Sequence, residues 1–222
     1  MSANHHPSEA TLLAHATGQL SEGLSLVVAT HMAWCPPCAD AVVAAETVGG
    51  VLLSQASPAE CSENLLLRTL QALDRRPAAS TPQRPAMAGG SALGELIFPQ
   101  PLQGYLDALG GARWRRLGFG IERICLIPRT AGGGTVHVLR AKPGIRLPRH
   151  GHVGAELSVI LSGAYEDEIG RFQRGDVADL DETVRHRPHS DEREGCVCLI
   201  ATEGPPRFEG LLARMIRPVT GF

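Results

Sequence analysis

The sequence has no run of apolar residues as long as a membrane-spanning helix requires. Residues 1–20 also lack the layout of a secretory signal peptide. These two absences predict a cytoplasmic protein with no membrane partner. Disulfides are rare in that reducing compartment, so metal binding or redox chemistry explains the six cysteines better than a disulfide framework does.

Basic residues are scarce near the amino terminus. Residues 1–76 contain seven acidic and three basic residues, a net charge of −4, whereas residues 102–222 contain 17 basic and 15 acidic residues, a net charge of about +2. No basic recognition helix is evident in the sequence. This balance predicts no direct contact with nucleic acid and favours docking of the amino-terminal part on a basic protein.

The spacing of apolar residues predicts helices in the first third of the chain. Ser8 and Ser21 each precede apolar residues that recur three and four apart, which marks two helix starts. A third helix is expected to begin at Pro36 and to end at Gly49–Gly50, because proline suits a first turn and glycine a helix end. A fourth helix is expected over about residues 60–75.

The pattern changes after this helical part. Residues 77–101 contain five prolines among small and polar residues, which indicates a linker with little chance of packing into a core. From residue 102 onward, short runs of β-forming residues alternate with glycine, proline and aspartate. Frequent short strands of this kind predict a β-sandwich or barrel.

A set of soft metal ligands lies between the second and third predicted helices. Cys35 follows His31 by four residues and Cys38 follows three residues later, so two helix ends bring one imidazole and two thiols together. This combination favours a closed zinc site, which needs a fourth ligand. The nearest imidazoles are His5 and His6, and His6 is preferred because it lies closer to the first helix. The alternatives are a metal-free cysteine pair and a thioredoxin-like redox pair, which would need a βαβ context.

A second cluster contains no sulfur. The spacing Gly144-x5-His150-x-His152-x3-Glu156-x6-Gly163 resembles the first motif of the cupin superfamily. If His150 and His152 alternate along one strand, both point into the barrel, and Glu156 returns to the same centre. A set of imidazoles and a carboxylate suits zinc, iron, manganese or nickel.

The second cupin motif is looser. It is carried by Gly170, Phe172, Gly175 and Asp176, and it predicts His186 as the fourth ligand of this cluster, with His189 as the competitor. A barrel without metal, in which these histidines simply pack, is the alternative.

The order of these parts resembles the ChrR-type zinc-binding anti-sigma factors, in which a helical domain with a His-x3-Cys-x2-Cys motif precedes a cupin. The likeness covers nearly the whole chain and includes His5–His6, residues 24–31, residues 114–118 and the Cys196–Val–Cys198 segment. It implies an all-α four-helix anti-sigma domain over residues 1–76, a linker over 77–101, and an all-β cupin domain (a jelly-roll barrel) over 102–222.

The resemblance also implies the site residues and the function. It implies two zinc ions per chain, the first held by His6, His31, Cys35 and Cys38 and the second by His150, His152, Glu156 and His186. By this resemblance the protein is a regulator and not an enzyme. Its helical domain binds and inhibits a group IV (extracytoplasmic-function) sigma factor as a 1:1 heterodimer, and its cupin releases that factor in response to singlet oxygen or photooxidative stress.

Two further expectations concern particular side chains. The leucines of the fourth helix exceed what one buried face requires, so part of them is expected to face the sigma factor; the alternative is that they close the helical bundle. Cys196 and Cys198 lie on one face of a strand and are candidate sensors. The rival function is a metal-dependent cupin dioxygenase with a helical accessory domain, because three His and one Glu can hold iron with open positions.

Overall fold

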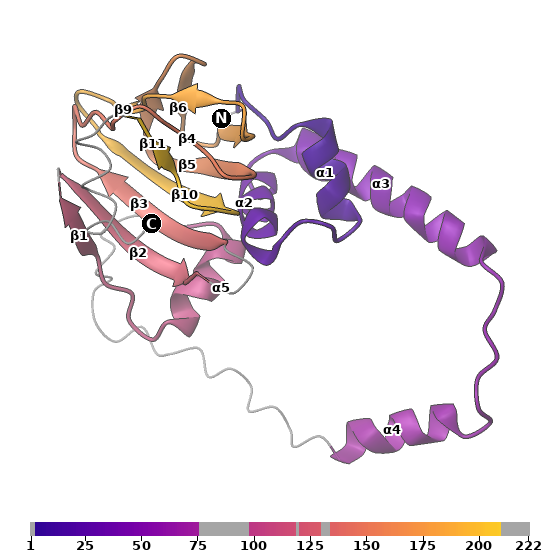
Figure 1. Cartoon of the computed structure of the whole chain (residues 1–222). Helices are drawn as coiled ribbons and strands as arrows, with labels where there is room; N and C mark the ends of the chain where they lie inside the picture. Colours follow the sequence, from indigo (N-terminus) through magenta and orange to yellow (C-terminus); the bar gives the residue numbers. More distant parts are fainter. Residues whose placement is uncertain (1–2, 76–97, 119, 130–133, 210–222) are drawn as a thin grey trace.

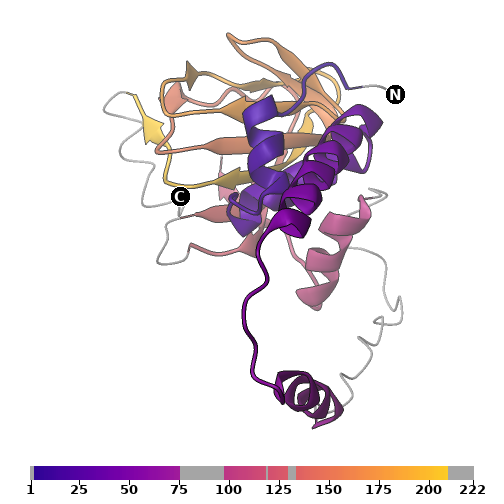
Figure 2. The ribbon, with the colours of Figure 1, turned by 90° about the vertical axis from the view of Figure 1, so that its right-hand side faces the viewer.

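The computed structural model describes residues 3–75, 98–118, 120–129 and 134–209. Within these ranges the chain forms five helices and eleven strands (Figure 1). The helices are α1 (Glu9–Ala16), α2 (Glu22–Met32), α3 (Pro36–Gln55), α4 (Leu65–Arg75) and α5 (Gln100–Ala108). Figure 2 shows α1, α2, α3 and α5 on one side of the strands, with α4 standing apart.

The strands form two antiparallel sheets. The larger has the order β1-β2-β3-β10-β5-β6, with β7 and β9 also pairing with β5, and the smaller has the order β11-β4-β8. This is the barrel-like β part that the sequence predicts. The bounds are β1 (Arg115–Gly118), β2 (Ile121–Ile127), β3 (Thr135–Ala141), β4 (His150–Gly151), β5 (Glu156–Glu166), β6 (Arg171–Gln173), β7 (Val177–Leu180), β8 (Arg185–His186), β9 (His189–Ser190), β10 (Cys196–Thr202) and β11 (Arg207–Phe208).

The starts of the first two helices are fixed by serine caps. The Ser8 hydroxyl accepts a hydrogen bond from the Thr11 amide, and the Ser21 hydroxyl accepts one from the Leu24 amide. Each bond satisfies an amide that has no partner inside the helix. Both starts confirm the sequence expectation.

Helix α2 joins the helical part to the sheet. It packs against β5 and β10, and its buried residues Leu24, Val27 and Val28 belong to the same core cluster as Val159 and Leu199 of those strands. Gly23 makes this approach possible: a Cβ there would lie 2.5 Å from Cγ2 of Val136. The two parts of the chain therefore share one core.

Helix α3 runs past its expected end. The sequence predicted a stop at Gly49–Gly50, but the helix continues to Gln55. Glycine inside a helix costs only about 1 kcal/mol relative to alanine, which a 20-residue helix tolerates.

The sequence also predicted that no apolar run is long enough to span a membrane. That expectation is wrong by length and composition, because α3 has 20 residues and a mean hydropathy of 1.3. One helix of this kind is weak evidence of a membrane span.

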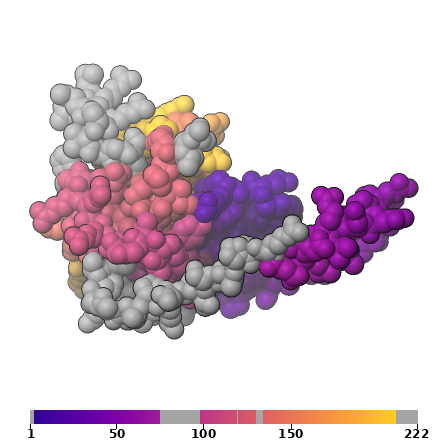
Figure 3. All heavy atoms as spheres, turned by 90° about the horizontal axis from the view of Figure 1, so that it is seen from below, coloured from indigo at the N-terminus to yellow at the C-terminus, as the bar shows by residue number. Residues whose placement is uncertain are grey.

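Most of α3 and all of α4 lie outside the core. Only Cys38 and Val42 of α3 are buried, and the side chains of residues 65–74 in α4 are exposed. Helix α4 also begins at Leu65, later than the predicted residue 60. Figures 1 and 2 show α4 away from the other helices, so its leucines do not close a bundle. In Figure 3 the purple region that contains α3 and α4 projects beyond the rest of the chain.

The predicted linker is shorter at its carboxy-terminal end. Phe98 is buried, and α5 begins at Gln100 with Leu102 and Leu106 in the core. The Tyr105 hydroxyl donates a 2.6 Å hydrogen bond to the Glu22 carboxylate at the start of α2. Residues 98–101 thus belong to the packed structure, and residues 76–97 lie outside the described residues.

We expect Gly23→Ala to destabilise the folded chain by about 1–3 kcal/mol, because the added methyl overpacks the contact between α2 and β3. Thermal and denaturant unfolding would measure the change. Gly49→Ala is the matched control: nothing lies within 4 Å of its Cβ position, so we expect a gain of up to about 1 kcal/mol from helix propensity. A stabilising Gly23→Ala would contradict the tight contact, and adding Val136→Ala should restore part of the loss.

Candidate metal centres

The four residues predicted for the first site come together in the structure. His6 precedes α1, His31 lies in the last turn of α2, Cys35 is the N-cap of α3, and Cys38 lies in its first turn. Their ligand atoms all lie within 4.8 Å of one another, and all but His6 are buried. Three separate chain segments therefore meet at one point.

The spacing of the ligand atoms suits a tetrahedral cation. His6 Nδ1 lies 3.4 Å from each of the two sulfurs and 3.4 Å from His31 Nε2, which lies 3.3 Å from Cys38 Sγ. Zinc–sulfur bonds of about 2.3 Å and zinc–nitrogen bonds of about 2.0 Å at tetrahedral angles separate neighbouring ligands by about 3.3–3.8 Å. The donor set and its dimensions thus fit zinc.

The protonation of His31 agrees with that fit, whereas a thiolate at Cys38 needs a cation beside it. His31 Nδ1 lies 2.8 Å from the Gly175 carbonyl oxygen and donates to it, which leaves Nε2 free to bind a metal. Burial lowers the pKa of His31, so the imidazole is neutral. Burial and the neighbouring Cys35 raise the pKa of Cys38 to about 12, so the scaffold alone favours the neutral thiol. A divalent cation is the charge that would stabilise two thiolates here.

His5, the alternative ligand, points elsewhere. Its Nδ1 lies 3.2 Å from the Asp176 carboxylate, and its ring centroid lies 4.4 Å from that of Phe172 in the cupin. The structure therefore brings His6 and not His5 to the first cluster.

The second predicted cluster also forms. His150 on β4 pairs in register with His186 on β8, and Glu156 is the first residue of β5. Strand β4 ends at Gly151, so His152 lies just beyond it, and the strand does not carry both histidines as expected. All four are buried and their ligand atoms lie within 4.8 Å of one another.

His189, the competitor of His186, does not join this cluster. It lies on β9 opposite Glu166, and its Nε2 is 3.9 Å from a Glu192 carboxylate oxygen. The structure therefore favours His186, in the paired strands β4 and β8, as the fourth member of the set.

Two buried nitrogens of the second cluster have no partner among the described residues, namely Nε2 of His152 and Nε2 of His186. The Nδ1 atoms of His150 and His186 are engaged by the Pro148 carbonyl at 3.0 Å and the Asp167 carboxylate at 2.7 Å. Burial lowers the pKa of His150, which keeps its ring neutral. Buried imidazole nitrogens without a hydrogen-bond partner, beside the Glu156 carboxylate, fit a divalent cation.

Asp167 is a site residue that the sequence did not predict. Its side chain is fully buried in the β5–β6 turn, where it accepts the hydrogen bond that orients His186. The sequence signal that could have identified Asp167 was an acidic residue in the hairpin between the two cupin motifs. Many hairpin turns carry aspartate for local reasons, so that signal alone was weak.

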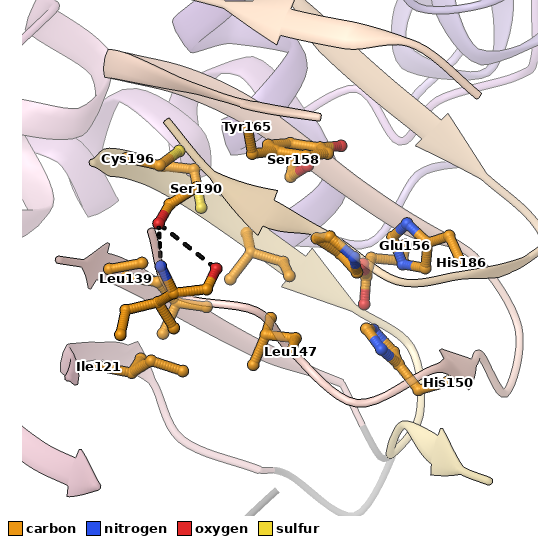
Figure 4. A pocket seen from close by; sticks show the side chains of 15 residues that line it. Ile121, Leu139, Leu147, His150, Glu156, Ser158, Tyr165, His186, Ser190 and Cys196 are labelled. Atoms are coloured by element: carbon orange, nitrogen blue, oxygen red, sulfur yellow. Dashed lines mark hydrogen bonds between the residues drawn. The ribbon is translucent and has the colours of Figure 1, made fainter. Parts of the chain in front are cut away.

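A cavity of about 90 Å³ lies beside the second cluster (Figure 4). Its walls are mainly aliphatic, and they include Cys196 and Cys198 of β10, which share one face as expected. Both cysteines are free thiols. Contact with Cys196 and burial raise the pKa of Cys198 well above its usual value, so this thiol reacts slowly. The cavity could take a small apolar ligand next to a bound metal.

Fold and sites together define a class: a helical unit with a His2Cys2 set, packed on a cupin with a His3Glu set. A family model described as the ChrR cupin-like domain matches residues 106–204. The chain is 38% identical over 219 residues to the anti-sigma-E factor ChrR of Cereibacter sphaeroides, covering 98% of each chain. The crystal structure of Rhodobacter sphaeroides SigE in complex with the anti-sigma ChrR matches with 37% identity and a TM-score of 0.70, covering 90% of this chain and 99% of that one. The chain belongs to the ChrR family of anti-sigma factors.

We expect Asp167→Asn to weaken metal binding at the second cluster by about 10–100-fold, because the loss of its carboxylate frees the His186 ring. Titration against a chromophoric chelator would measure the affinity. Asp191→Asn, a turn aspartate that bonds Arg171 and its own turn, should leave it unchanged. Equal affinities for the Asp167 variant and the wild type would show that this hydrogen bond does not position the ligand.

Proposed function

We propose that this chain is a zinc-dependent anti-sigma factor that binds an ECF sigma factor in a 1:1 complex and inhibits it. The helical part, residues 1–76, would make the contact, and the cupin would govern release in response to singlet oxygen or related photooxidative stress. Membership of the ChrR family supports this function, as does the relative crystallised with SigE. The net charge of −4 on residues 1–76 supports a basic protein partner and not DNA.

The observation that carries the proposal is the apolar surface of α3 and α4. We define this α3–α4 surface by its large exposed residues, Val43, Val48, Val51, Leu52, Leu53, Leu65, Leu66, Leu67, Leu70 and Leu73. Exposed apolar surface of this extent marks an interaction site. An isolated helix of 11 residues is marginal in water, so α4 gains most of its stability from a partner that covers its leucines.

Zinc is the metal that the first cluster fits, and we assign it a structural role there. The helical part buries few residues of its own, and a small unit of this kind depends on added cross-links. Zinc bound there would supply coordination bonds that join the segment before α1 to the ends of α2 and α3. Those ends set the direction in which α3 leaves the core, so the site positions the α3–α4 surface.

The second cluster, with its adjoining cavity, is assigned to signal sensing. The cavity is lined by three of the four metal-binding side chains, His150, Glu156 and His186, so a small molecule that enters it reaches the metal cluster directly, which supports a response that begins there and not at the slowly reacting Cys198 thiol. We place the protein in the cytoplasm, where sigma factors act. The dioxygenase alternative is not favoured, because the relative that covers 98% of the chain is named as an anti-sigma factor.

We expect the pair Leu66→Asp and Leu70→Asp to weaken sigma-factor binding at least tenfold, because both leucines lie on the exposed face that would be covered. Calorimetry with the ECF sigma factor that co-purifies with the wild-type chain would measure this. Thermal stability of the free chain should not fall, since these side chains are exposed. Gln71→Asp on the same helix is the control for added charge. A wild-type chain that captures no ECF sigma factor on co-expression would refute the function itself.

Metal analysis of aerobically purified protein separates the regulator from the enzyme. We expect two zinc ions per chain, falling to one in the Cys35→Ser, Cys38→Ser variant, because the second cluster has no sulfur ligand. Plasma emission spectrometry gives the stoichiometry. One zinc and one iron per chain would instead support the cupin dioxygenase.

A further inference from the structure

The segment before α1 is held by the cupin. The carboxylate of Asp176, in the turn between β6 and β7, accepts hydrogen bonds from the amides of Asn4 (2.6 Å) and His5 (3.2 Å) and engages the His5 ring at 3.2 Å. The Val177 amide at the start of β7 donates to the His5 carbonyl at 3.0 Å. These bonds tie together residues more than 170 positions apart in the sequence.

Contacts on both sides of His6 complete this anchoring. The His5 ring packs on Phe172 of β6. Asp179 of β7 accepts hydrogen bonds from the Ser8 amide at 2.9 Å and the Thr11 hydroxyl at 2.7 Å. His6 itself makes none of these bonds with the cupin; its ring faces the first cluster. Its position in the chain is therefore set by neighbours that the cupin holds.

The same turn reaches a second ligand of that cluster. His31 donates from Nδ1 to the carbonyl oxygen of Gly175, the residue before Asp176. That bond fixes the ring orientation in which Nε2 faces the cysteines. Both imidazoles of the first cluster thus depend on two adjacent residues of the cupin, while both cysteines belong to α3 and its cap.

We propose that the β6–β7 turn of the cupin is a positioning element of the amino-terminal metal site, acting through the Asp176 carboxylate and the Gly175 carbonyl. The inference rests on the proposed metal at that site and adds that the site is built by both domains. Its consequence is that the helical part holds metal more tightly when it is docked on the cupin. The cupin orders residues 4–6 before metal binds. The free energy of metal binding therefore does not have to offset the conformational entropy lost on ordering them.

Cobalt substitution in the full-length chain tests this inference. A thiolate-to-cobalt charge-transfer band reports the first cluster alone, because the second has no sulfur ligand. For Asp176→Asn we expect the cobalt affinity read from this band to fall by about 10–100-fold. Cobalt binding at the second cluster, followed by competition with a chelator, should keep its wild-type affinity. Asp181→Asn, a carboxylate that bonds Thr183 and Val184 in its own turn, should match the wild type.

If Asp176→Asn does not fold, a second variant tests whether the β6–β7 turn positions the first cluster. His5→Phe keeps an aromatic ring against Phe172 and removes only the side-chain bond to Asp176, so we expect a several-fold loss of cobalt affinity at the first cluster. Wild-type affinity in both variants would overturn the inference. Complete loss of the band in His5→Phe alone would make His5 the ligand and also overturn it. A wild-type chain without the band would instead refute the metal assignment in the proposed function.

Discussion

The packing of α2 against the β-sheet is the interaction on which the rest of the structure depends. Its buried face joins the helical residues and the strand residues in one core cluster, and Gly23 allows the helix to approach the sheet closely. A helical unit of this size buries a small fraction of its surface and is only marginally stable alone. By docking on the cupin it acquires a core, and its other helices take their positions from α2.

This arrangement divides the helices by what they bury. Helix α2 buries its apolar side chains against the sheet. Helix α3 buries only Cys38 and Val42, and its later valines and leucines are exposed. The two helices meet at the first metal cluster, where His31 lies in the last turn of α2 and Cys35 is the N-cap of α3. Metal at that junction would fix the angle between the anchored helix and the projecting one.

Ligand spacing and serine caps were readable in the sequence because they are local. His31, Cys35 and Cys38 lie within eight positions, and the structure brings them together as the spacing predicts. His6, which joins them, is preferred over His5 and implied by the family resemblance, because the spacing alone does not identify the fourth ligand. What the sequence could not give depends on contacts between distant segments. Asp167 orients His186 only because the β5–β6 hairpin folds against that residue. Helix α3 continues past its two glycines because the free-energy cost of glycine inside a helix is small. The shared core was equally hidden, since apolar periodicity does not say which partner a face meets.

Strand β5 relates the two metal clusters physically. Glu156 of the second cluster begins this strand, which pairs with β7 from Glu156 opposite Leu180 to Val159 opposite Val177. Beyond that pairing, Ile160 bonds the backbone of Gly175 and Asp176. Gly175 accepts the hydrogen bond from the His31 ring, and the Asp176 carboxylate holds Asn4 and His5, which precede His6. Energetic coupling between two sites can be carried by packed and hydrogen-bonded elements that lie between them. The turn between β6 and β7 is such an element, because β5 supports it from one side and the segment carrying His6 rests on it from the other.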